Sequence, residues 1–315
     1  MDPITALLDG PRARGAFVLR CLLEPPWSMA VRDEAPLTVV AVTRGEAWIT
    51  QHGTAVHLPE GSVALVVGPE HYEVTSTPGR AADVIIHPGQ RCETPSGESL
   101  ELSMRLGVRS WGHARSATST LLVGTYEDAT SLRSEVLATL TSPAVVSFGD
   151  GDPLLALLAR ELSRDLPGQQ TLLDRLLDAL AVDALRRWCA EHPDQAPPWW
   201  DGHRDPVVGE ALRLLHDDPA HPWTIAEVAS RIGTSRASLS RRFTDLVGEG
   251  VITYLTRWRL GLAADLLAEP GRSIGEVAAE VGYGSPFALS TAFKRRYGIS
   301  PNHHRQAIRA AETTT

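Results

Sequence analysis

Residues 223–297 contain one helical pattern twice. Residues Ile225–Ala229 match Ile274–Ala278 at an offset of 49 positions, and further along Phe243 matches Phe293 at an offset of 50. The copies therefore agree at their apolar positions and differ by a single inserted residue. A repeat of this length usually marks one supersecondary unit that occurs twice. We expect the stretch to fold as two similar pieces.

Each copy predicts two short helices joined by a glycine turn. In the first copy, apolar residues recur at helical spacing from Ile225 to Ile232, and Gly233 supplies the turn. Thr224 and Glu227 have the spacing of a capping box at the start of the first helix. The second helix of each copy has a basic outer face, which is typical of a helix-turn-helix unit. A helical bundle with solvated charges is the alternative.

Between the copies, residues 251–267 predict one amphipathic helix. Leu255, Trp258 and Leu262 fall at three- and four-residue spacing, and Pro270-Gly271 ends the pattern. A rigid helix at this place would fix the separation of the two basic helices. Two such helices must lie about 34 Å apart to enter successive major grooves of one duplex. The pattern therefore predicts double-stranded DNA as a partner, bound over two successive turns.

Six motifs in the last hundred residues carry a family resemblance. They are Trp223-Thr224-Ile225, Ser235–Phe243, Tyr254–Leu260, Ile274, Val281-Gly282-Tyr283 and Phe293–Pro301. On these residues the C-terminal part resembles the AraC/XylS family of bacterial transcription regulators. The resemblance implies sequence-specific DNA binding and, as in most relatives, activation with RNA polymerase as a partner. Two departures, Gly250-Val251 in place of Ser-Pro and His304 in place of Tyr, lie away from the basic faces.

The outward positions of the second helix in each copy are the candidate DNA contacts. Arg241 is the best candidate for a guanine contact in the first copy. The outward residues of the second copy are weaker hydrogen bonders, so we expect apolar or backbone-led readout there, with Lys294 and Arg295 on phosphates. The full set is Arg236, Ala237, Ser240 and Arg241 in the first copy, and Ser285, Pro286, Phe287, Ser290, Thr291, Lys294 and Arg295 in the second.

The charge of the chain is divided unevenly between its two parts. The net charge is −8. Residues 201–315 hold 14 Lys and Arg against 13 Asp and Glu, a net charge of +1, and residues 1–200 hold 16 against 25, a net charge of −9. The acidity thus belongs to the N-terminal part, and the local patch on the basic helices matters more for DNA than the total.

Length and composition bound the remaining possibilities. A chain of 315 residues is long enough for two or three domains. It contains no run of roughly 18 apolar residues, and its N-terminus lacks the basic flank and apolar core of a signal peptide. Three cysteines in unrelated contexts fit a reducing compartment. We therefore expect a cytoplasmic protein with no membrane partner.

The first half predicts an antiparallel β-barrel or sandwich. Turn signals such as Arg44-Gly45 and His52-Gly53 separate short β-rich runs. Residues 91–120 are rich in Gly, Ser, Thr and Arg and predict mostly loop. The runs are residues 16–22, 38–43, 46–50, 55–58, 62–67 and 82–87.

The order of these runs and turns resembles the cupin barrel that is fused to many AraC-type regulators. The opening at residues 2–8 and Pro26-Trp27 match that sub-group as well. We therefore expect a multidomain α and β protein with an N-terminal antiparallel cupin-like barrel and a C-terminal all-α domain. The expected divisions are a sensor domain at 1–148, a helical hairpin at 149–190, a linker at 191–205 and a double helix-turn-helix domain at 206–310.

The cupin resemblance also bears on what the barrel binds. Many cupins hold a metal with a His-x-His pair, but no such pair occurs here, and Val40 stands near a position that often carries His. We expect no metal, no cofactor and no enzymatic activity, but a small-molecule effector in an apolar barrel. A metal site, and with it a cupin-type enzyme, is the alternative. The candidate effector contacts, each of which could simply pack the barrel, are Trp27, Trp48, His71, Tyr72 and Trp111.

Cys21 and Cys92 are candidates for oxidant sensing, because some cupin-type relatives use barrel cysteines in this way. Sensing needs a thiol of low pKa next to positive charge, which Arg20, Arg91 and His113 could supply. Buried and inert thiols are the alternative.

Two leucine-rich helices are predicted between the two halves of the chain. Residues 153–166 and 171–188 have apolar stripes at helical spacing and are joined at Pro167-Gly168. Such a hairpin either packs inside its own chain or, as often in this family layout, makes the contact of a homodimer. The Pro-rich residues 191–205 predict a linker, and the first helix of the DNA-binding domain follows at 206–216.

Overall fold

The computed structural model describes residues 17–126, 140, 142–149, 151–269 and 271–314. The expected cupin-like opening at residues 2–8 lies outside them. The strands and the first two described helices form one compact unit, and the helices from residue 196 onward form another. Each unit is described by itself. None of the described helices is both long enough and apolar enough to span a bilayer.

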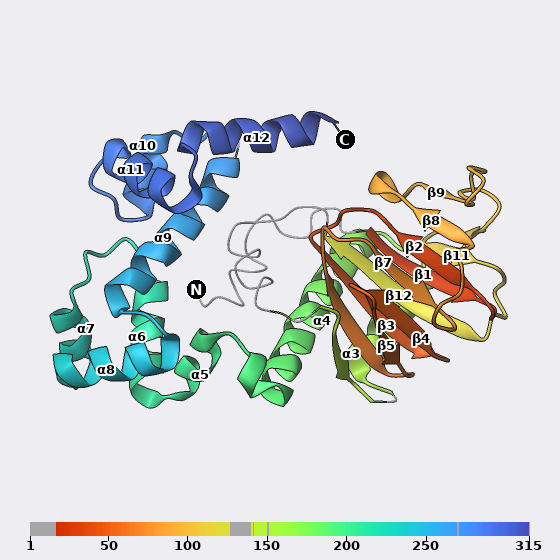
Figure 1. Ribbon diagram of the computed structural model, residues 1–315, viewed down its shortest axis with the longest axis horizontal. Helices are drawn as coiled ribbons and strands as arrows, with labels where there is room; N and C mark the ends of the chain where they lie inside the picture. Colours follow the sequence, from red (N-terminus) through yellow and green to blue (C-terminus); the bar gives the residue numbers. More distant parts are fainter. Residues whose placement is uncertain (1–16, 127–139, 141, 150, 270, 315) are drawn as a thin grey trace. The chain divides into compact units, whose positions relative to one another are not determined.

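The first unit contains two sheets packed face to face (Figure 1). In hydrogen-bonded order, the first sheet is β10 (Arg105–Gly107), β11 (Ser110–Gly112), β1 (Phe17–Leu23), β12 (Ser119–Tyr126), β3 (Leu37–Arg44), β6 (Ser62–Val67) and β13 (Ala144–Ser147). The second is β5 (Thr54–Leu58), β4 (Ala47–Gln51), β7 (Tyr72–Thr75), β2 (Ser28–Val31), β8 (Val84–Ile86) and β9 (Cys92–Glu93). The short 3-10 helix η1 (Pro88–Gln90) precedes β9.

The predicted β-rich, cupin-like fold is confirmed, with two differences in detail. Most strand pairs are antiparallel, but β1 pairs with β11 and β2 pairs with β8 in parallel. Within the described residues, no ladder joins the two sheets into a closed ring. The core lies between the sheets, where apolar side chains from both meet, among them Val42, Ile49, Ala64 and Leu121.

Strand β12 was missed in the sequence, although it is central. It pairs with β1 on one side, from Phe17↔Thr125 to Leu23↔Ser119, and with β3 on the other. Its buried residues do not alternate cleanly with exposed ones, because helices cover the outer face of this sheet while the core covers the inner face. The period of two that marks a half-exposed strand is therefore weak.

Helices α3 (Pro153–Leu162) and α4 (Gln169–Glu191) pack against the seven-stranded sheet. Gly124 in β12 makes room for α4, since a Cβ at Gly124 would lie 2.3 Å from a methyl carbon of Leu177. The Tyr126 hydroxyl donates a hydrogen bond to the buried carboxylate of Asp178 at 3.1 Å. The leucine stripe of α4 is thus mostly buried within its own chain, although Leu172 keeps 41% of its surface exposed.

The segment expected as a linker is partly helical. Residues 193–195 form the 3-10 helix η2 (Pro193–Gln195), and residues 198–204 form α5 (Pro198–Arg204), which packs on the helices that follow. Gly202 lies close to Val208 and Val247, so α5 shares their core. Proline-rich composition hid this helix, because proline is well tolerated in the first turn of a helix.

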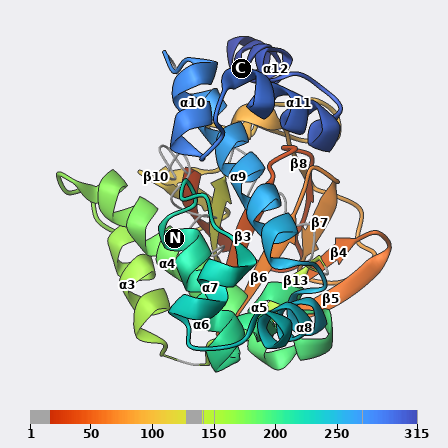
Figure 2. The ribbon, with the colours of Figure 1, turned by 90° about the vertical axis from the view of Figure 1, so that its left-hand side faces the viewer.

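The second unit contains the two expected helix pairs. They are α7 (Ile225–Arg231) with α8 (Arg236–Val247), and α10 (Ile274–Glu280) with α11 (Pro286–Tyr297). Helix α6 (Pro206–Asp217) precedes them and α12 (Pro301–Thr314) follows. Helix α9 (Val251–Ala268) packs against α8 and also against α10, α11 and α12. Figure 2 shows α9 running from one pair to the other.

Candidate nucleic-acid interface and ligand cavity

Helix α8 presents the first set of candidate DNA contacts. Its N-terminus is capped by Ser235, whose hydroxyl oxygen accepts a hydrogen bond from the backbone N–H of Ser238 at 3.1 Å. Its inner face buries Leu239 and Phe243. The four predicted contacts lie on the rest of the helix: Arg236, Ala237 and Arg241 are exposed, and Ser240 is half-buried.

Helix α11 presents the second set. Ser285 caps it by accepting from the N–H of Ala288 at 3.2 Å, and Leu289 and Phe293 are buried. Phe287 keeps 82% of its surface exposed, which is unusual for a phenylalanine. The remaining predicted contacts are also at the surface, with Ser285, Pro286, Thr291, Lys294 and Arg295 exposed and Ser290 half-buried.

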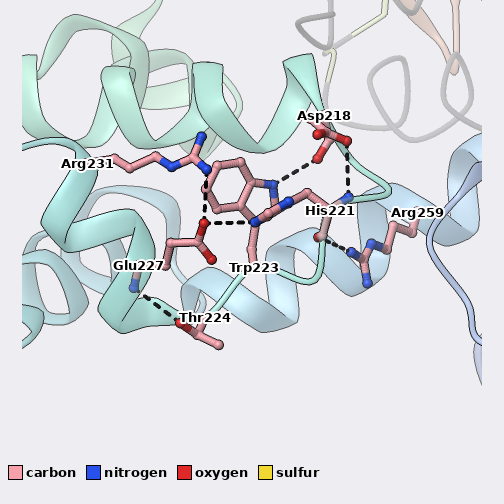
Figure 3. A network of polar contacts seen from close by, with 7 residues as sticks. All are labelled: Asp218, His221, Trp223, Thr224, Glu227, Arg231 and Arg259. Atoms are coloured by element: carbon pink, nitrogen blue, oxygen red, sulfur yellow. Dashed lines mark hydrogen bonds and ion pairs between the residues drawn. The ribbon is translucent and has the colours of Figure 1, made fainter.

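A polar network surrounds the start of α7 in the first copy (Figure 3). The Trp223 indole N–H donates to the Asp218 carbonyl at 2.8 Å, and the Arg231 guanidinium lies 4.6 Å from the Trp223 ring centroid. Thr224 caps α7 as expected, accepting from the Glu227 N–H at 3.2 Å. The Glu227 carboxylate, however, contacts His221 at 2.8 Å and Arg231 at 3.0 Å. The capping box expected in this copy is therefore only half formed.

The second copy forms the complete capping box. The Ser273 hydroxyl accepts from the Glu276 N–H at 3.1 Å, and the Glu276 carboxylate accepts from the Ser273 N–H at 2.8 Å. This hydrogen bond holds the pKa of the Glu276 carboxyl below its usual value. Two donors at the start of α10 are satisfied reciprocally.

The two copies are tied to each other by more than α9. The Arg259 guanidinium, on α9, donates to the carbonyls of Pro219 at 2.6 Å and His221 at 2.7 Å, in the loop before α7. Gly282, in the turn between α10 and α11, approaches the same loop: a Cβ at Gly282 would lie 2.5 Å from the Ala220 carbonyl oxygen. The spacing of α8 and α11 therefore depends on this contact as well as on the connecting helix.

Arginines away from the basic helices are mostly engaged with partners. Arg213 pairs with Glu210 and with Asp217, and Arg257 pairs with Glu249 at 2.9 Å. Four basic residues on α8 and α11 are not engaged in this way. Among the described residues, no acidic side chain forms an ion pair with Arg236, Arg241, Lys294 or Arg295. Arg242 lies 4.0 Å from Asp205, and Arg204 at the end of α5 is also exposed.

The β unit has a partly open cavity of about 450 Å³ that is lined by residues of both sheets. Of the five predicted effector contacts, Tyr72 and Trp111 line it. The other three do not. Trp27 is buried in the core outside the cavity wall, Trp48 faces away from it and packs on His57 with ring centroids 4.6 Å apart, and His71 is exposed.

Strand geometry explains why Trp48 and His71 do not line the cavity. In β4, Ala47, Ile49 and Gln51 are buried, so Trp48 lies on the opposite face. His71 precedes β7, whose first residue Tyr72 points inward. Sequence reasoning missed the polar part of the wall, which comes from turns and short strands with no periodic signal: Asp33, Gln90, Glu101, Arg105 and Arg109.

Cys21 and Cys92 both lie in the cavity wall. Burial, with a smaller contribution from Cys92, raises the pKa of the Cys21 thiol to about 12. Burial followed by the charge of Glu101 raises the pKa of the Cys92 thiol to about 11. Both thiols are therefore protonated near neutral pH, which disfavours the thiolate chemistry that oxidant sensing needs. Within the described residues, no group of three or more His, Cys, Asp or Glu side chains could hold a metal ion.

Comparisons with known proteins agree with both units. A cupin family model matches residues 2–190, and a helix-turn-helix domain model matches residues 228–307. An AraC-like transcription regulator of Streptomyces antibioticus is 30% identical over 97% of this chain and 99% of the relative. The RCS-specific HTH-type transcriptional activator RclR of Escherichia coli is 28% identical over 48% of this chain and 53% of the relative.

Among solved structures, the DNA-binding domain of AdpA in complex with a target DNA is 32% identical, with 35% of this chain and 99% of that chain covered and a TM-score of 0.33. The whole-length match in Streptomyces and the two domain models together identify the family. The chain belongs to the AraC-like, DNA-binding transcription regulators, in which a cupin domain precedes the helix-turn-helix domain.

Proposed function

We propose that α8 and α11 enter successive major grooves of one DNA duplex and recognise it unequally. Helix α8 reads bases through Arg236, Ala237, Ser240 and Arg241. Helix α11 contacts DNA mainly through its apolar N-terminal turn and through Lys294 and Arg295 on phosphates. The observation that carries this proposal is the distribution of cations: among the described residues, Arg236, Arg241, Lys294 and Arg295 on the two recognition helices are exposed and form no ion pair with an acidic side chain, whereas Arg213 and Arg257 are paired.

Free cations matter because a phosphate or a base must otherwise displace an existing partner. An arginine in an ion pair has already lost part of its attraction for DNA. An exposed, unpaired guanidinium such as that of Arg241 can donate two hydrogen bonds to guanine O6 and N7. Lys294 and Arg295 lie near the C-terminal end of α11, where a phosphate contact would position the helix without reading sequence.

The chemistry of α11 supports the weaker direct readout. Pro286 and Phe287 offer no side-chain hydrogen bond. The Thr291 hydroxyl already donates to the Phe287 carbonyl at 3.0 Å. Only Ser285, which caps the helix, and Ser290 remain, and Ser290 is half-buried. Fewer free donors and acceptors on this helix imply fewer bidentate base contacts.

A gel-shift series tests the division. Arg241→Ala should relax the preference at one base step by about 1–3 kcal/mol, because it removes a bidentate base contact. Lys294→Ala should weaken all sequences alike and reduce the slope of log affinity against log salt by about 0.9. Arg213→Ala is the matched control, since Arg213 is also exposed but is paired on α6, and it should change neither quantity. Equal loss of sequence preference in Arg241→Ala and Lys294→Ala would contradict the assignment.

The regulatory outcome is a separate proposal. We infer that the chain activates transcription through RNA polymerase, that a small molecule bound by the cupin domain controls it, and that it forms a homodimer. Activation is supported by the name of the Escherichia coli relative. Burial of the α4 leucine stripe leaves Leu166 and Leu172 as the exposed leucines of the hairpin. Transcription from a target promoter in vitro, with and without the purified chain, distinguishes an activator from a repressor, and sedimentation gives the oligomeric state.

The competing functions have direct tests. A cupin-type enzyme would need a resident metal, so stoichiometric iron, zinc or manganese in the purified chain would support that reading. An oxidant sensor would need Cys21 or Cys92, and the raised pKa of each thiol argues against it. We expect hydrogen peroxide to leave the DNA binding of the unsubstituted chain unchanged, and we expect the same for Cys21→Ser and Cys92→Ser.

A further inference from the structure

The connecting helix α9 passes from one apolar core to the other near its middle. Tyr254, in its N-terminal half, is buried against Phe243 of the first copy, with ring centroids 5.7 Å apart. Leu260 and the buried residues after it belong to the core of the second copy, together with Phe293. Arg259 lies at this changeover. A helix that enters two cores fixes the distance between them, but each copy can still turn about the helix unless a second contact prevents it.

Arg259 supplies such a second contact (Figure 3). Its guanidinium reaches from α9 to the loop at residues 218–223, which leads into α7 of the first copy. There Nε donates to the Pro219 carbonyl at 2.6 Å, and Nη2 donates to the His221 carbonyl at 2.7 Å. The two donors lie on one edge of a planar, rigid group, so both hydrogen bonds form in only one orientation of the loop. The contact therefore fixes a direction as well as a distance.

The loop at residues 218–223 touches both copies. The Asp218 carbonyl accepts from the Trp223 indole at 2.8 Å, so the first copy holds the shape of the loop. Ala220 lies against the second copy, where a Cβ at Gly282 would be 2.5 Å from the Ala220 carbonyl oxygen. A loop that is shaped by one copy and touched by the other can hold the two copies in one relative orientation.

The surroundings of Arg259 indicate that it holds backbone rather than a counter-charge. It is half-buried, and burial lowers the pKa of its guanidinium. Among the described residues, no carboxylate forms an ion pair with it. Arg272, which is also half-buried, instead pairs with Glu269 at 2.8 Å and with Glu280. The two loop carbonyls are therefore the partners that explain why an arginine stands at position 259.

We propose that Arg259 is a positioning residue for DNA recognition: it fixes the separation and rotation of α8 and α11, so that the protein discriminates DNA sites by the spacing of their two half-sites. The inference rests on the proposed function, in which both helices enter successive major grooves. One base pair moves a half-site by about 3.4 Å along the duplex and by about 35° around it. A rigidly held pair of helices cannot follow this change, whereas a pair that turns about α9 can follow it in part.

Gel shifts with the full-length chain test the proposal. A duplex selected from a randomised library by the unsubstituted chain supplies the site, and one base pair is inserted or removed between its two protected major-groove segments. For the unsubstituted chain, we expect each change to weaken binding about tenfold, which is comparable with one mismatched base pair. For Arg259→Ala, we expect about threefold, because the loosened copies adapt at a smaller loss of contacts. The ratio is taken within each variant, so a smaller folded fraction cancels.

Two further variants assign the effect to the guanidinium. Arg259→Lys keeps the charge but not the planar fork, so most of the tolerance for altered spacing should remain, and this variant also serves if Arg259→Ala does not fold. Arg272→Ala is the matched control, because it removes a half-buried arginine whose ion pairs are with Glu269 and Glu280, and it should keep the tenfold penalty. The same tolerance in Arg272→Ala would indicate general loosening and would overturn the inference.

The spacing profiles also separate this inference from the proposed function. If the unsubstituted chain binds all spacings equally, α8 and α11 do not dock together, which refutes the proposed function and this inference with it. If the unsubstituted chain and both Arg259 variants show the same tenfold penalty, the two helices dock together but Arg259 does not position them. That result refutes this inference alone.

Discussion

The two helix-turn-helix copies use the same glutamate for different purposes. In the second copy, Glu276 accepts from the Ser273 backbone and closes the capping box. In the first copy, Glu227 turns away from its own cap and contacts His221 and Arg231, both of which also lie against Trp223. The difference teaches that one motif at one spacing can stabilise its helix by two routes, and that nearby partners decide which route is taken.

The glycine turns of the two copies also differ in what surrounds them. Gly233 and Gly282 both have positive φ, +66° and +80°. A Cβ at Gly233 would have no neighbour within 4 Å, whereas a Cβ at Gly282 would lie 2.5 Å from the Ala220 carbonyl oxygen. The first turn therefore needs glycine for its backbone angle alone. The second needs it also because the loop before α7 packs on it.

Substitution of these two glycines has the largest expected effect on the comparison. Gly233→Ala should lower the free energy of unfolding by about 1–2 kcal/mol, which is the strain of a left-handed alanine. Gly282→Ala should lower it by about 2–4 kcal/mol, because a steric clash with the Ala220 backbone adds to that strain. Urea unfolding of the full chain, followed by far-ultraviolet circular dichroism, measures both.

DNA binding gives a second readout for the same pair of variants. If Gly282 fixes the spacing of α8 and α11, then Gly282→Ala should weaken binding to a site with both half-sites more than Gly233→Ala does. Equal losses in stability and in binding would mean that the two turns are equivalent and that the contact with Ala220 does not set the spacing.

The recognition helices are compared by a smaller and more local change. The exposed ring of Phe287 can make an apolar contact with a thymine methyl group in the major groove. Replacement of that thymine by deoxyuridine removes only the methyl group and should weaken binding about fourfold, from about 0.8 kcal/mol per buried carbon. Phe287→Ala should bind the thymine and uracil duplexes equally. A uracil effect confined to the half-site of α8 would contradict a role for Phe287.

Much of the C-terminal unit could be predicted from the sequence because its signals are local. Helix caps at Ser235, Ser273 and Ser285 and the buried spacing of Leu239 with Phe243 depend on residues a few positions apart. The fate of Glu227 could not be predicted in the same way, because its partner His221 lies outside the helix and is placed by the loop.

The cavity was harder to predict, because its wall is assembled from distant parts of the chain. Tyr72 and Trp111 line the cavity, whereas Trp27, Trp48 and His71, which were named as candidate contacts on the same grounds, lie elsewhere. Whether a strand residue faces the cavity depends on register, and a shift by one residue reverses the face. Strands β10 and β11, with a register shift between them, give too short a pattern to fix that register.

The smallest expected effect is a pH dependence of the second copy's capping box. The Ser273 N–H donates to the Glu276 carboxylate, and this hydrogen bond holds the pKa of Glu276 below its usual value of 4.5. The contribution of this carboxylate to stability is therefore present above pH 4.5 and is lost as the pH falls through the lowered folded pKa. In Glu276→Gln the amide oxygen can accept the same hydrogen bond at every pH, whereas Glu276→Ala lacks it throughout. Between about pH 6 and pH 3, the melting temperature of the unsubstituted chain should move from that of the glutamine variant towards that of the alanine variant. If the melting temperature stays with that of the glutamine variant over the whole range, the charge of the Glu276 carboxylate adds nothing to the capping box. The second copy would then gain no pH dependence that the first copy, in which Glu227 does not close a capping box, lacks.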